Sequence, residues 1–550
     1  MEAVIDFGGV VPDAERPLGI DVATREFLRA FFRFANQSSF SALTPNVAAF
    51  TTFRDMAAEE HIAPQRCRQI GADDAAALEA SGVLVRYDPA LASLAWRRRW
   101  HGQRRYSLVG IAHASASARA MEAIGALATA PVQAWDALIC PSQSIRRAIS
   151  TVLDGWQSYL EERFGGNAAC PLFLPVIPLG VDTVRFEKIS GPEQRALSRA
   201  RLGIADHAVA ILYVGRLNYI AKANPLALLL AAEDVAKRLA QPVHLIFNGY
   251  FNDAENERAF DEAIAALSTK AHVQIVRHGH PDFPDGLWAV ADIFCAPTDN
   301  IQESFGLTPI EAMAAGVPSV VADWDGYRDT VRDGVDGFVV PTLAPPPGAG
   351  IEIAHEYFTG RATYGDYLGA ASQSTAVDVE ALARALFTLA ANPDLRRDMG
   401  ISARLRARDA FEWSRIIRDY GALWADLSER RQSAPERAGG REAFHPSHPD
   451  PFAMFASFPS AHFQPHGRIE LTGIDWSEAM RRIGLKTGLI VPQSLIELEE
   501  LPLLIGQLES VSTTTIEEIA RTLGFTDQPR LLRTVGWLVK LGICRYHPPE

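Results

Sequence analysis

Two glutamates, Glu303 and Glu311, enclose the sequence Ser-Phe-Gly-Leu-Thr-Pro-Ile, and both carboxylates could accept hydrogen bonds from the hydroxyl groups of a sugar. The residues between them predict the start of a helix. We expect Thr308 to be its N-cap and Pro309 its first residue, because threonine caps free N–H groups and proline has none. Glu311 then lies three residues after the cap, which is the spacing of a capping box. That structural role is compatible with hydroxyl binding.

The same segment predicts an anion site. The backbone N–H groups around Gly306 and Leu307 would lie at the amino end of the helix, where the macrodipole attracts negative charge. Glu303 would lie in the loop just before that end. A phosphate site beside two hydroxyl-binding carboxylates is the combination that binding of a nucleotide sugar requires.

A second candidate site follows the apolar run 211–214, which ends in Gly215 and Arg216 and is followed by Lys222. Glycine at a strand end lets the backbone approach a ligand closely, and two cations can neutralise a diphosphate. Taken alone, the two cations are most simply explained as solvated side chains. Together with the 303–311 segment, they favour binding of a diphosphate and stabilisation of its charge as it leaves.

The composition is that of an ordinary enzyme with several domains. A chain of 550 residues is too long to fold around a single hydrophobic core. With 48% hydrophobic and 22% charged residues, it has enough apolar side chains to form several cores. The net charge of -13 argues against binding of nucleic acid or an anionic membrane across the whole surface. We expect no signal peptide, no transmembrane segment and a cytoplasmic location, since no long apolar run is present and the scattered cysteines fit reduced thiols.

Short apolar runs alternate with helical patterns from about residue 105 onward, which predicts parallel sheets covered by helices. A first series of strands is expected at 83–86, 107–112, 137–140 and 173–178. After a connector at 181–190, a second series is expected at 209–214, 243–248, 273–277, 292–296, 319–322 and 338–341. This pattern predicts two α/β domains with a cleft between them. Ligands bind such sheets beyond the carboxyl ends of the strands.

An insertion between residues 343 and 378 follows the second series. It carries Tyr357, Tyr364 and Tyr367, which we interpret as packing residues rather than as a platform for a sugar ring. The insertion could cover the cleft or form a surface excursion, and the sequence leaves both open. The helix expected at 411–427 places its aromatic residues on one apolar face, so it should pack against another element.

The last part of the chain differs in character. Residues 428–465 are rich in Pro, Arg, His and Ser and are interpreted as a linker, whose histidines lack the arrangement of a metal site. Residues 466–550 should form a small module with a helix ending at Gly524, a second helix at 530–541 and a strand at 543–547. That order resembles a winged helix-turn-helix. Its modest basic content favours docking of a protein partner over DNA binding.

Several segments resemble retaining glycosyltransferases of family 4, which have the GT-B fold. They are Val-Ile-Pro-Leu-Gly-Val-Asp from Val176, Val-Gly-Arg-Leu from Val214, Glu-Ser-Phe-Gly-Leu-Thr-Pro-Ile-Glu from Glu303, and Asp-Gly-Val-Asp-Gly-Phe from Asp333. The resemblance extends over about residues 105–425.

The resemblance implies an α/β protein with two Rossmann-like domains facing a cleft. The acceptor-side domain would occupy residues 1–185 and the nucleotide-sugar-binding domain residues 186–427, followed by the linker 428–465 and the mainly α module 466–550. It also implies that a sugar passes from a nucleotide-diphosphate sugar to an acceptor hydroxyl of unknown identity. The anomeric configuration would be retained. We expect no metal or other cofactor, because Arg216, Lys222 and the helix dipole can serve the diphosphate.

The resemblance also assigns roles to individual residues. Arg216 and Lys222 would bind the donor diphosphate. Glu303 would hold hydroxyls of the transferred sugar, and Glu311 those of the ribose. His113 matches the cleft histidine that contacts the donor sugar near its anomeric carbon. The remaining donor-binding positions are the backbone groups of Gly215, Phe305, Gly306 and Leu307, and His280 in the turn that faces the nucleotide base.

Two other interpretations remain. The two glutamates could be the acid and the nucleophile of a glycoside hydrolase, but the cations and the anion-binding helix end would then be unexplained. Alternatively, the chain could be a catalytically inactive scaffold or regulatory protein that works through its C-terminal module. The complete set of cleft residues argues against that interpretation.

Overall fold

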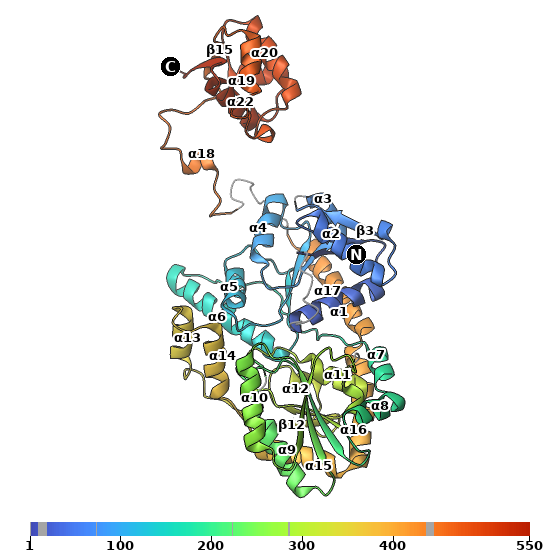
Figure 1. The fold of residues 1–550 in the computed structure, drawn as a ribbon. Helices are drawn as coiled ribbons and strands as arrows, with labels where there is room; N and C mark the ends of the chain where they lie inside the picture. The colour runs from blue at the N-terminus through green and yellow to red at the C-terminus, as the bar shows by residue number, and fades with distance from the viewer. Residues whose placement is uncertain are drawn as a thin grey trace. The chain divides into compact units, whose positions relative to one another are not determined.

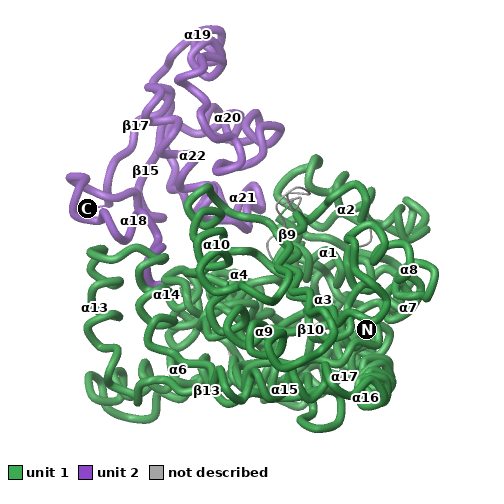
Figure 2. The backbone as a smooth tube through the Cα atoms, turned by 60° about the horizontal axis from the view of Figure 1, so that its bottom comes forward, with its two compact units in different colours: residues 1–445 green, residues 446–550 purple. Residues whose placement is uncertain are grey.

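The computed structural model describes residues 2–8, 19–72, 74–222, 224–283, 286–435 and 445–549. They form two compact units, residues 1–445 and residues 446–550 (Figure 2). The first unit contains two parallel β-sheets (Figure 1). Each sheet has a hydrophobic core on both of its faces. Within the described ranges, no helix combines the length and the apolar character needed to cross a membrane.

The N-terminal lobe is built on a six-stranded sheet in the order β3-β2-β1-β4-β5-β6. The strands are β1 (Glu2–Asp6), β2 (Phe40–Leu43), β3 (Cys67–Ile70), β4 (Gly82–Arg86), β5 (Ser107–Ile111) and β6 (Ala137–Ile139). The helices are α1 (Gly19–Phe34), α2 (Val47–Glu59), α3 (Ala75–Ser81), α4 (Ala92–His101), α5 (Ala118–Gly125) and α6 (Gln143–Phe164). The central strands are continuous apolar runs because helices cover both faces of a parallel sheet.

This sheet differs from the predicted series at two places. The series lacks β1, β2 and β3, which are short and, in β3, largely polar and exposed. The strand expected at 173–178 is wrong: Phe173 and Val176 make only isolated bridges to the β6 region. Pro175 and Pro178 lack the N–H groups that a regular ladder needs.

The C-terminal lobe has a second six-stranded sheet, in the order β12-β11-β10-β7-β8-β9. The strands are β7 (Val209–Val214), β8 (Val243–Gly249), β9 (His272–Arg277), β10 (Ile293–Ala296), β11 (Ser319–Ala322) and β12 (Gly337–Val340). The helices around it are α7 (Thr183–Ile189), α8 (Pro192–Arg201), α9 (Leu226–Arg238), α10 (Ala254–Leu267), α11 (Leu307–Ala315), α12 (Tyr327–Thr330), α15 (Val379–Ala391) and α16 (Pro393–Arg406). Both sheets have Rossmann-like order, which confirms the predicted fold class.

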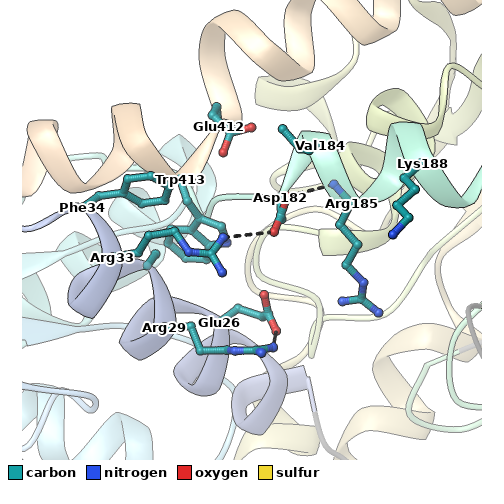
Figure 3. Close-up of a pocket in the computed structure, with 11 residues that line it drawn as sticks. Glu26, Arg29, Arg33, Phe34, Asp182, Val184, Arg185, Lys188, Glu412 and Trp413 are labelled. Atoms are coloured by element: carbon teal, nitrogen blue, oxygen red, sulfur yellow. Dashed lines mark hydrogen bonds and ion pairs between the residues drawn. The ribbon is translucent and has the colours of Figure 1, made fainter. Parts of the chain in front are cut away.

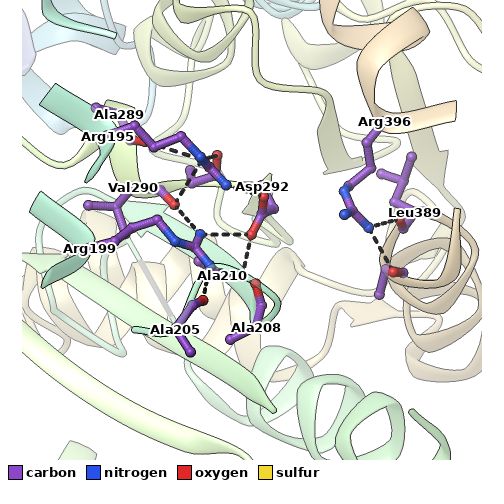
Figure 4. A network of polar contacts seen from close by, with 12 residues as sticks. Arg195, Arg199, Ala205, Ala208, Ala210, Ala289, Val290, Asp292, Leu389 and Arg396 are labelled. Carbon is purple, nitrogen blue, oxygen red and sulfur yellow. Dashed lines mark hydrogen bonds and ion pairs between the residues drawn. The ribbon is translucent and has the colours of Figure 1, made fainter. Parts of the chain in front are cut away.

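A buried ion-pair network fixes the end of the second sheet away from the candidate site (Figure 4). Asp292, just before β10, accepts hydrogen bonds from Arg195 at 2.6 Å, Arg199 at 3.0 Å and the N–H of Ala210 at 2.8 Å. The N-terminal lobe has an equivalent pair, Arg98 with Asp136, and both side chains are fully buried. Arg98 and Arg199 also donate to backbone carbonyls of neighbouring segments, and these bonds hold the strands and helices of each pair together.

Helix α17 (Trp413–Ser433) returns the chain from the second lobe to the first. Its buried residues Trp413, Tyr420 and Trp424 join the aromatic core around Phe27 and Phe31 of α1. The apolar face predicted for this helix is therefore the face that packs. The N-terminal lobe is therefore built from two parts of the chain, one that precedes the C-terminal lobe in the sequence and one that follows it.

The insertion is a helical hairpin between β12 and α15. A short antiparallel pair, β13 (Thr342–Leu343) and β14 (Ala376–Val377), closes its base, and its helices are α13 (Ile351–Phe358) and α14 (Tyr364–Gln373). Tyr357 stacks on Tyr367 with ring centroids 4.7 Å apart. The interpretation of these tyrosines as packing residues agrees with that stack.

The second unit, residues 446–550, has a three-stranded antiparallel sheet in the order β16-β15-β17 and its own hydrophobic core. Its elements are α18 (Pro451–Met454), β15 (Arg468–Leu471), α19 (Trp476–Ile483), α20 (Leu501–Ser510), β16 (Thr514–Thr515), α21 (Ile516–Leu523), α22 (Gln528–Lys540) and β17 (Cys544–His547). The helix predicted to end at Gly524 does so, since Gly524 adopts a left-handed C-cap with φ 71°. The sequence pattern did not predict α19 and α20.

Candidate functional site

The candidate site lies beyond the carboxyl ends of β7 and β10, where the strand order of the second sheet reverses. Gly215 and Arg216 directly follow β7, and Glu303 lies in the loop after β10. Open α/β sheets bind ligands at this switch point because loops from the adjacent strands diverge there. Gly215 has φ 156°, and its N–H donates to the carbonyl of Asn248 in β8 at 3.0 Å.

The helix after Glu303 begins two residues earlier than predicted. Helix α11 starts at Leu307, and its N-cap is Gly306, with φ 88° and no side-chain cap. A Cβ at Gly306 would lie 2.1 Å from a ring carbon of Tyr327, so both the positive φ and the close packing require glycine. The prediction of Thr308 as N-cap, with Pro309 as first residue, is therefore wrong. The absence of a side-chain cap leaves amino-terminal N–H groups available to a ligand.

The capping-box role predicted for Glu311 is also wrong, because Glu311 is the fifth residue of α11. Its half-buried side chain makes no hydrogen bond or ion pair within the described residues. Burial raises the pKa of Glu311 to about 7, and the positive charge of Arg185 opposes that rise. A carboxylate without a structural partner is free to bind a ligand.

Glu303 is the most strongly held residue of the site. It is 7% exposed and forms an ion pair with Lys222. It also accepts hydrogen bonds from the Tyr327 hydroxyl and the Ser304 N–H, each at 3.2 Å. Burial acts to raise the pKa of Glu303, but the charge of Lys222 and these hydrogen bonds outweigh it and lower the pKa below its usual range. Glu303 is therefore an anion at neutral pH.

Arg216 is oriented by a side chain that the sequence analysis did not single out. Its guanidinium donates to the amide oxygen of Gln302 at 2.8 Å. The amide nitrogen of Gln302 donates to the Tyr364 hydroxyl of the insertion at 3.1 Å. The insertion is therefore connected to the diphosphate-binding position predicted from the sequence.

His113 follows β5 in the N-terminal lobe and is 9% exposed. Its Nε2 atom has no hydrogen-bond partner among the described residues, and its ring stacks on Tyr87 at 6.5 Å. Burial lowers the pKa of His113 to about 4, against the weaker opposing effect of Asp88. His113 is therefore neutral at pH 7 and keeps an unused polar atom.

Contacts between the lobes bring the loops of both sheets together. The Ser142 hydroxyl donates to Asp325 at 2.9 Å, and the N–H of Gln143 donates to Asp329 at 2.7 Å. The N–H of Ala118, at the end of the loop that begins at His113, donates to the Tyr357 hydroxyl at 2.9 Å. These contacts place the loops after β5 and β6 against the loop after β11 and the insertion.

Two further predicted residues have different surroundings. Phe305 is 1% exposed and its ring packs at 6.2 Å against Phe411, so only its backbone could contact a ligand. His280 follows the edge strand β9, two strands away from β7. Its ring accepts the Asp282 N–H at 3.2 Å and packs on Phe283. The structure does not bring His280 into contact with the cluster around Glu303.

Asp325 and Tyr327 are the other site residues that the sequence analysis missed. Asp325 adopts φ 43°, and burial raises its pKa to about 7. A non-glycine residue with positive φ is uncommon, and aspartate tolerates it better than most residues. The sequence Asp325-Gly326 signals a turn, but nothing in it indicates the bond to Ser142, which is 183 positions distant.

Residues 194–345 match the family model described as Glycosyl transferases group 1. The matched segment contains Arg216, Lys222, Glu303 and Glu311. It ends within the insertion.

The chain is also similar to two bacterial enzymes named D-inositol 3-phosphate glycosyltransferase. It is 29% identical over 267 residues to the enzyme of Geodermatophilus obscurus, covering 48% of this chain and 49% of that protein. It is 34% identical over 179 residues to the enzyme of Salinispora tropica, covering 31% of this chain and 36% of that protein. The chain thus spans half or less of the length of these relatives.

Two solved structures have a similar fold. Anabaena HepE in complex with UDP matches with a TM-score of 0.52 and 17% identity, over 78% of this chain and 100% of that one. A glycosyltransferase from Rickettsia africae matches with a TM-score of 0.50 and 14% identity, over 78% and 98% of the two chains. These likenesses agree with the predicted GT-B fold of two Rossmann-like domains.

Proposed function

We propose that the protein transfers a sugar from a nucleotide-diphosphate sugar to an acceptor hydroxyl, as a retaining glycosyltransferase of family 4. The observation that carries the proposal is the buried Glu303 carboxylate beside Lys222, close to the uncapped amino end of α11. Sugar hydroxyls require a fixed acceptor of hydrogen bonds, and a diphosphate requires cations and N–H donors. The family match over residues 194–345 contains all of these groups.

In the proposed reaction the bond between the anomeric carbon and the diphosphate oxygen breaks, and the acceptor oxygen bonds to the same face of that carbon. The acceptor proton passes to an oxygen of the leaving diphosphate, so no protein base is needed. Arg216, Lys222 and the amino end of α11 stabilise the negative charge that develops on the leaving group. Glu303 and the neutral His113 hold the sugar. Glu311 binds the ribose.

The other parts of the chain have supporting roles in this proposal. The N-terminal lobe, completed by α17, forms the acceptor side and the C-terminal lobe binds the donor. The chain after α17 leads to a winged-helix-like module at 466–550 that docks a protein partner. The protein acts in the cytoplasm. The two cations and the helix end meet the diphosphate charge, which supports donor binding without a metal.

The test is thermal stabilisation of the full-length protein by UDP-, GDP- and ADP-sugars without added metal, followed by product analysis with the donor that binds. Binding to the native state raises the melting temperature as donor concentration increases. We expect one nucleotide class to shift the wild type and not the Arg216→Ala variant. No shift with any donor, or equal shifts in both proteins, would contradict the proposal.

A further inference from the structure

A pocket of about 600 Å³ lies outside the candidate donor site, between α1, α7 and the start of α17 (Figure 3). Its polar lining includes Arg29, Arg33, Asp182, Arg185, Lys188 and Glu412. The residues assigned above to donor binding do not line it. A pocket of this volume accommodates a small metabolite.

The pocket lies at the hinge between the lobes. The chain passes from one lobe to the other twice, just before α7 and just before α17, and residues of both segments line the pocket. Just beside it, the N–H of Val181 donates to the carbonyl of Phe411 at 2.8 Å. The Thr183 N–H donates to Glu412 at 3.1 Å, and the Thr183 hydroxyl also bonds to that carboxylate. One wall is α1 of the N-terminal lobe and another is α7 of the C-terminal lobe. Any change in the angle between the lobes would therefore change the shape of the pocket.

The basic residues on the α1 wall are already neutralised. Arg29 pairs with Glu60 at 3.0 Å, and Arg33 pairs with Glu60 at 2.8 Å and with Asp182 at 3.4 Å. These bonds hold α1 to its surroundings and leave no surplus positive charge on that side. The positive charge available to a ligand must come from the α7 wall.

Arg185 and Lys188 supply that charge. Within the described residues, neither side chain makes a hydrogen bond or an ion pair, and their spacing of three places both on one face of α7. The carboxylates in the lining do not cancel them. Asp182 caps α7 and pairs with Arg33, Glu412 is bonded to Thr183, and Glu26 pairs with Arg29 at 3.5 Å. Two cations in one pocket that make no hydrogen bond or ion pair among the described residues favour an anion with more than one charged oxygen.

The apolar wall adds an unused donor. Trp413 lines the pocket and is 3% exposed, yet its indole N–H has no hydrogen-bond partner among the described residues. A buried N–H without a partner is costly, and most such groups in proteins are satisfied. An oxygen atom of a bound ligand would satisfy it.

We propose that this hinge pocket binds a small phosphorylated anion, held by Arg185 and Lys188 with the Trp413 N–H as a further donor, and that binding restricts the angle between the lobes. The ligand would contact residues of both segments that connect the lobes, so its binding would change how readily the cleft closes. The proposal does not depend on the proposed transfer reaction.

The pocket is also connected electrostatically to the candidate donor site. Burial raises the pKa of Glu311, while Arg185 lowers it and Glu26 raises it, and both of these residues line the pocket. An anion that neutralised the charge of Arg185 would therefore reduce the effect of Arg185 on the pKa of Glu311.

The test uses inorganic pyrophosphate and calorimetric titration of the full-length protein, with Arg216→Ala as background so that the donor site contributes little. We expect binding to persist in this background and to weaken at least about tenfold when Arg185→Gln and Lys188→Gln are added, since two charge-assisted contacts are lost. Lys270→Gln, which removes one exposed charge far along the chain, is the control and should leave the affinity unchanged. Equal affinity with and without the α7 substitutions, or no binding in the Arg216→Ala background, would overturn the proposal.

A second variant tests the apolar wall. Trp413→Phe keeps an aromatic ring against Gly180 and removes only the N–H donor, and we expect it to weaken pyrophosphate binding about threefold to tenfold. The exposed α7 substitutions remain informative if this variant folds poorly. A donor-sugar titration of the protein with Arg216 intact, with and without the α7 substitutions, separates the two proposals. Pyrophosphate binding that depends on α7, with no donor binding, would leave the hinge site standing and contradict only the transferase assignment.

Discussion

Lys222 forms an ion pair with the buried carboxylate of Glu303 across the candidate donor site. The two residues are separated by 81 positions, and the sequence resemblance assigns them to different parts of the donor. The bond shows that the loop carrying Lys222 reaches the loop after β10. Each of these two residues neutralises the charge of the other, and their ion pair fixes the positions of both side chains.

The ion pair leads to a prediction about stability and pH. The pKa of Glu303 in the folded protein lies below its ordinary value, so the stability that it contributes is present above pH 4–5 and is lost as the pH falls through the folded pKa. In a Lys222→Met variant only the hydrogen bonds from Ser304 and Tyr327 still oppose burial, so the pKa of Glu303 should rise. We expect the variant to lose about 1–3 kcal/mol at pH 7 and much less at pH 4.

The measurement is the thermal midpoint of wild type and Lys222→Met between pH 4 and pH 8. The difference between the two proteins should increase with pH. A Lys270→Gln control, which removes an exposed lysine, should follow the wild type at every pH. A difference independent of pH would mean that the pair does not control the ionisation of Glu303.

A second prediction concerns Arg216. Its replacement by alanine should lower turnover about 10²–10³-fold, because a donor of hydrogen bonds to the leaving charge is lost. Gln302→Ala removes the amide that accepts from Arg216 at 2.8 Å and should reduce turnover by less, about threefold to tenfold. Steady-state kinetics with the donor found by stabilisation would test both variants. Near wild-type turnover for Arg216→Ala would contradict the transferase assignment.

The sequence predicted the parts of the site that depend on local pattern. The apolar runs of β7 and β10, followed by Gly215, Arg216 and Glu303, place these residues at the carboxyl ends of neighbouring strands. The exact helix start was predicted wrongly, because the positive φ of Gly306 and its packing on Tyr327 depend on a side chain more than twenty positions away. Local rules for caps cannot include such a contact.

Contacts between distant segments could not be predicted. Nothing in the sequence near Ser142 indicates that its hydroxyl bonds to Asp325, and the tyrosines of the insertion gave no sign of which lobe they reach. The first three strands were missed for a different reason. Short strands with polar residues, such as β3, lack the continuous apolar run that identifies buried parallel strands.

A third prediction concerns Glu311, whose pKa burial raises to about 7. The ionised carboxylate accepts hydrogen bonds from ribose hydroxyls better than the protonated form. Donor affinity should therefore rise about fivefold to tenfold between pH 6 and pH 8, as the carboxyl group loses its proton. In Glu311→Gln this dependence should disappear. Calorimetric titration of the donor at several pH values tests the prediction, and an unchanged pH profile in the variant would contradict it.

The sign of the stability effect for Glu311 is opposite to that for Glu303. A carboxyl group whose folded pKa is raised contributes stability below its unfolded pKa, near pH 4, and loses it as the pH rises through about 7. Without donor, Glu311→Gln should therefore stabilise the protein relative to wild type at pH 8 more than at pH 5. Thermal midpoints of the two proteins at these pH values measure the difference.

The last prediction concerns the contact between the insertion and the N-terminal lobe. The Tyr357 hydroxyl accepts the N–H of Ala118, whereas the Tyr367 hydroxyl, in the same stack, makes no hydrogen bond among the described residues. Tyr357→Phe should therefore weaken closure of the lobes and lower turnover about twofold to tenfold, the range expected for one hydrogen bond. Donor binding should change little, because Arg216 and Lys222, the cations proposed to bind the diphosphate, lie on the C-terminal lobe.

Tyr367→Phe is the matched control, since it removes a hydroxyl and keeps the ring. Steady-state kinetics of the two variants, together with donor titrations, separate an effect on closure from an effect on packing. If Tyr357→Phe and Tyr367→Phe lower turnover equally, the hydroxyl bond has no specific role and the insertion acts through packing alone. If only Tyr357→Phe lowers turnover, the insertion covers the cleft and takes part in closing it, and the alternative of a surface excursion is eliminated.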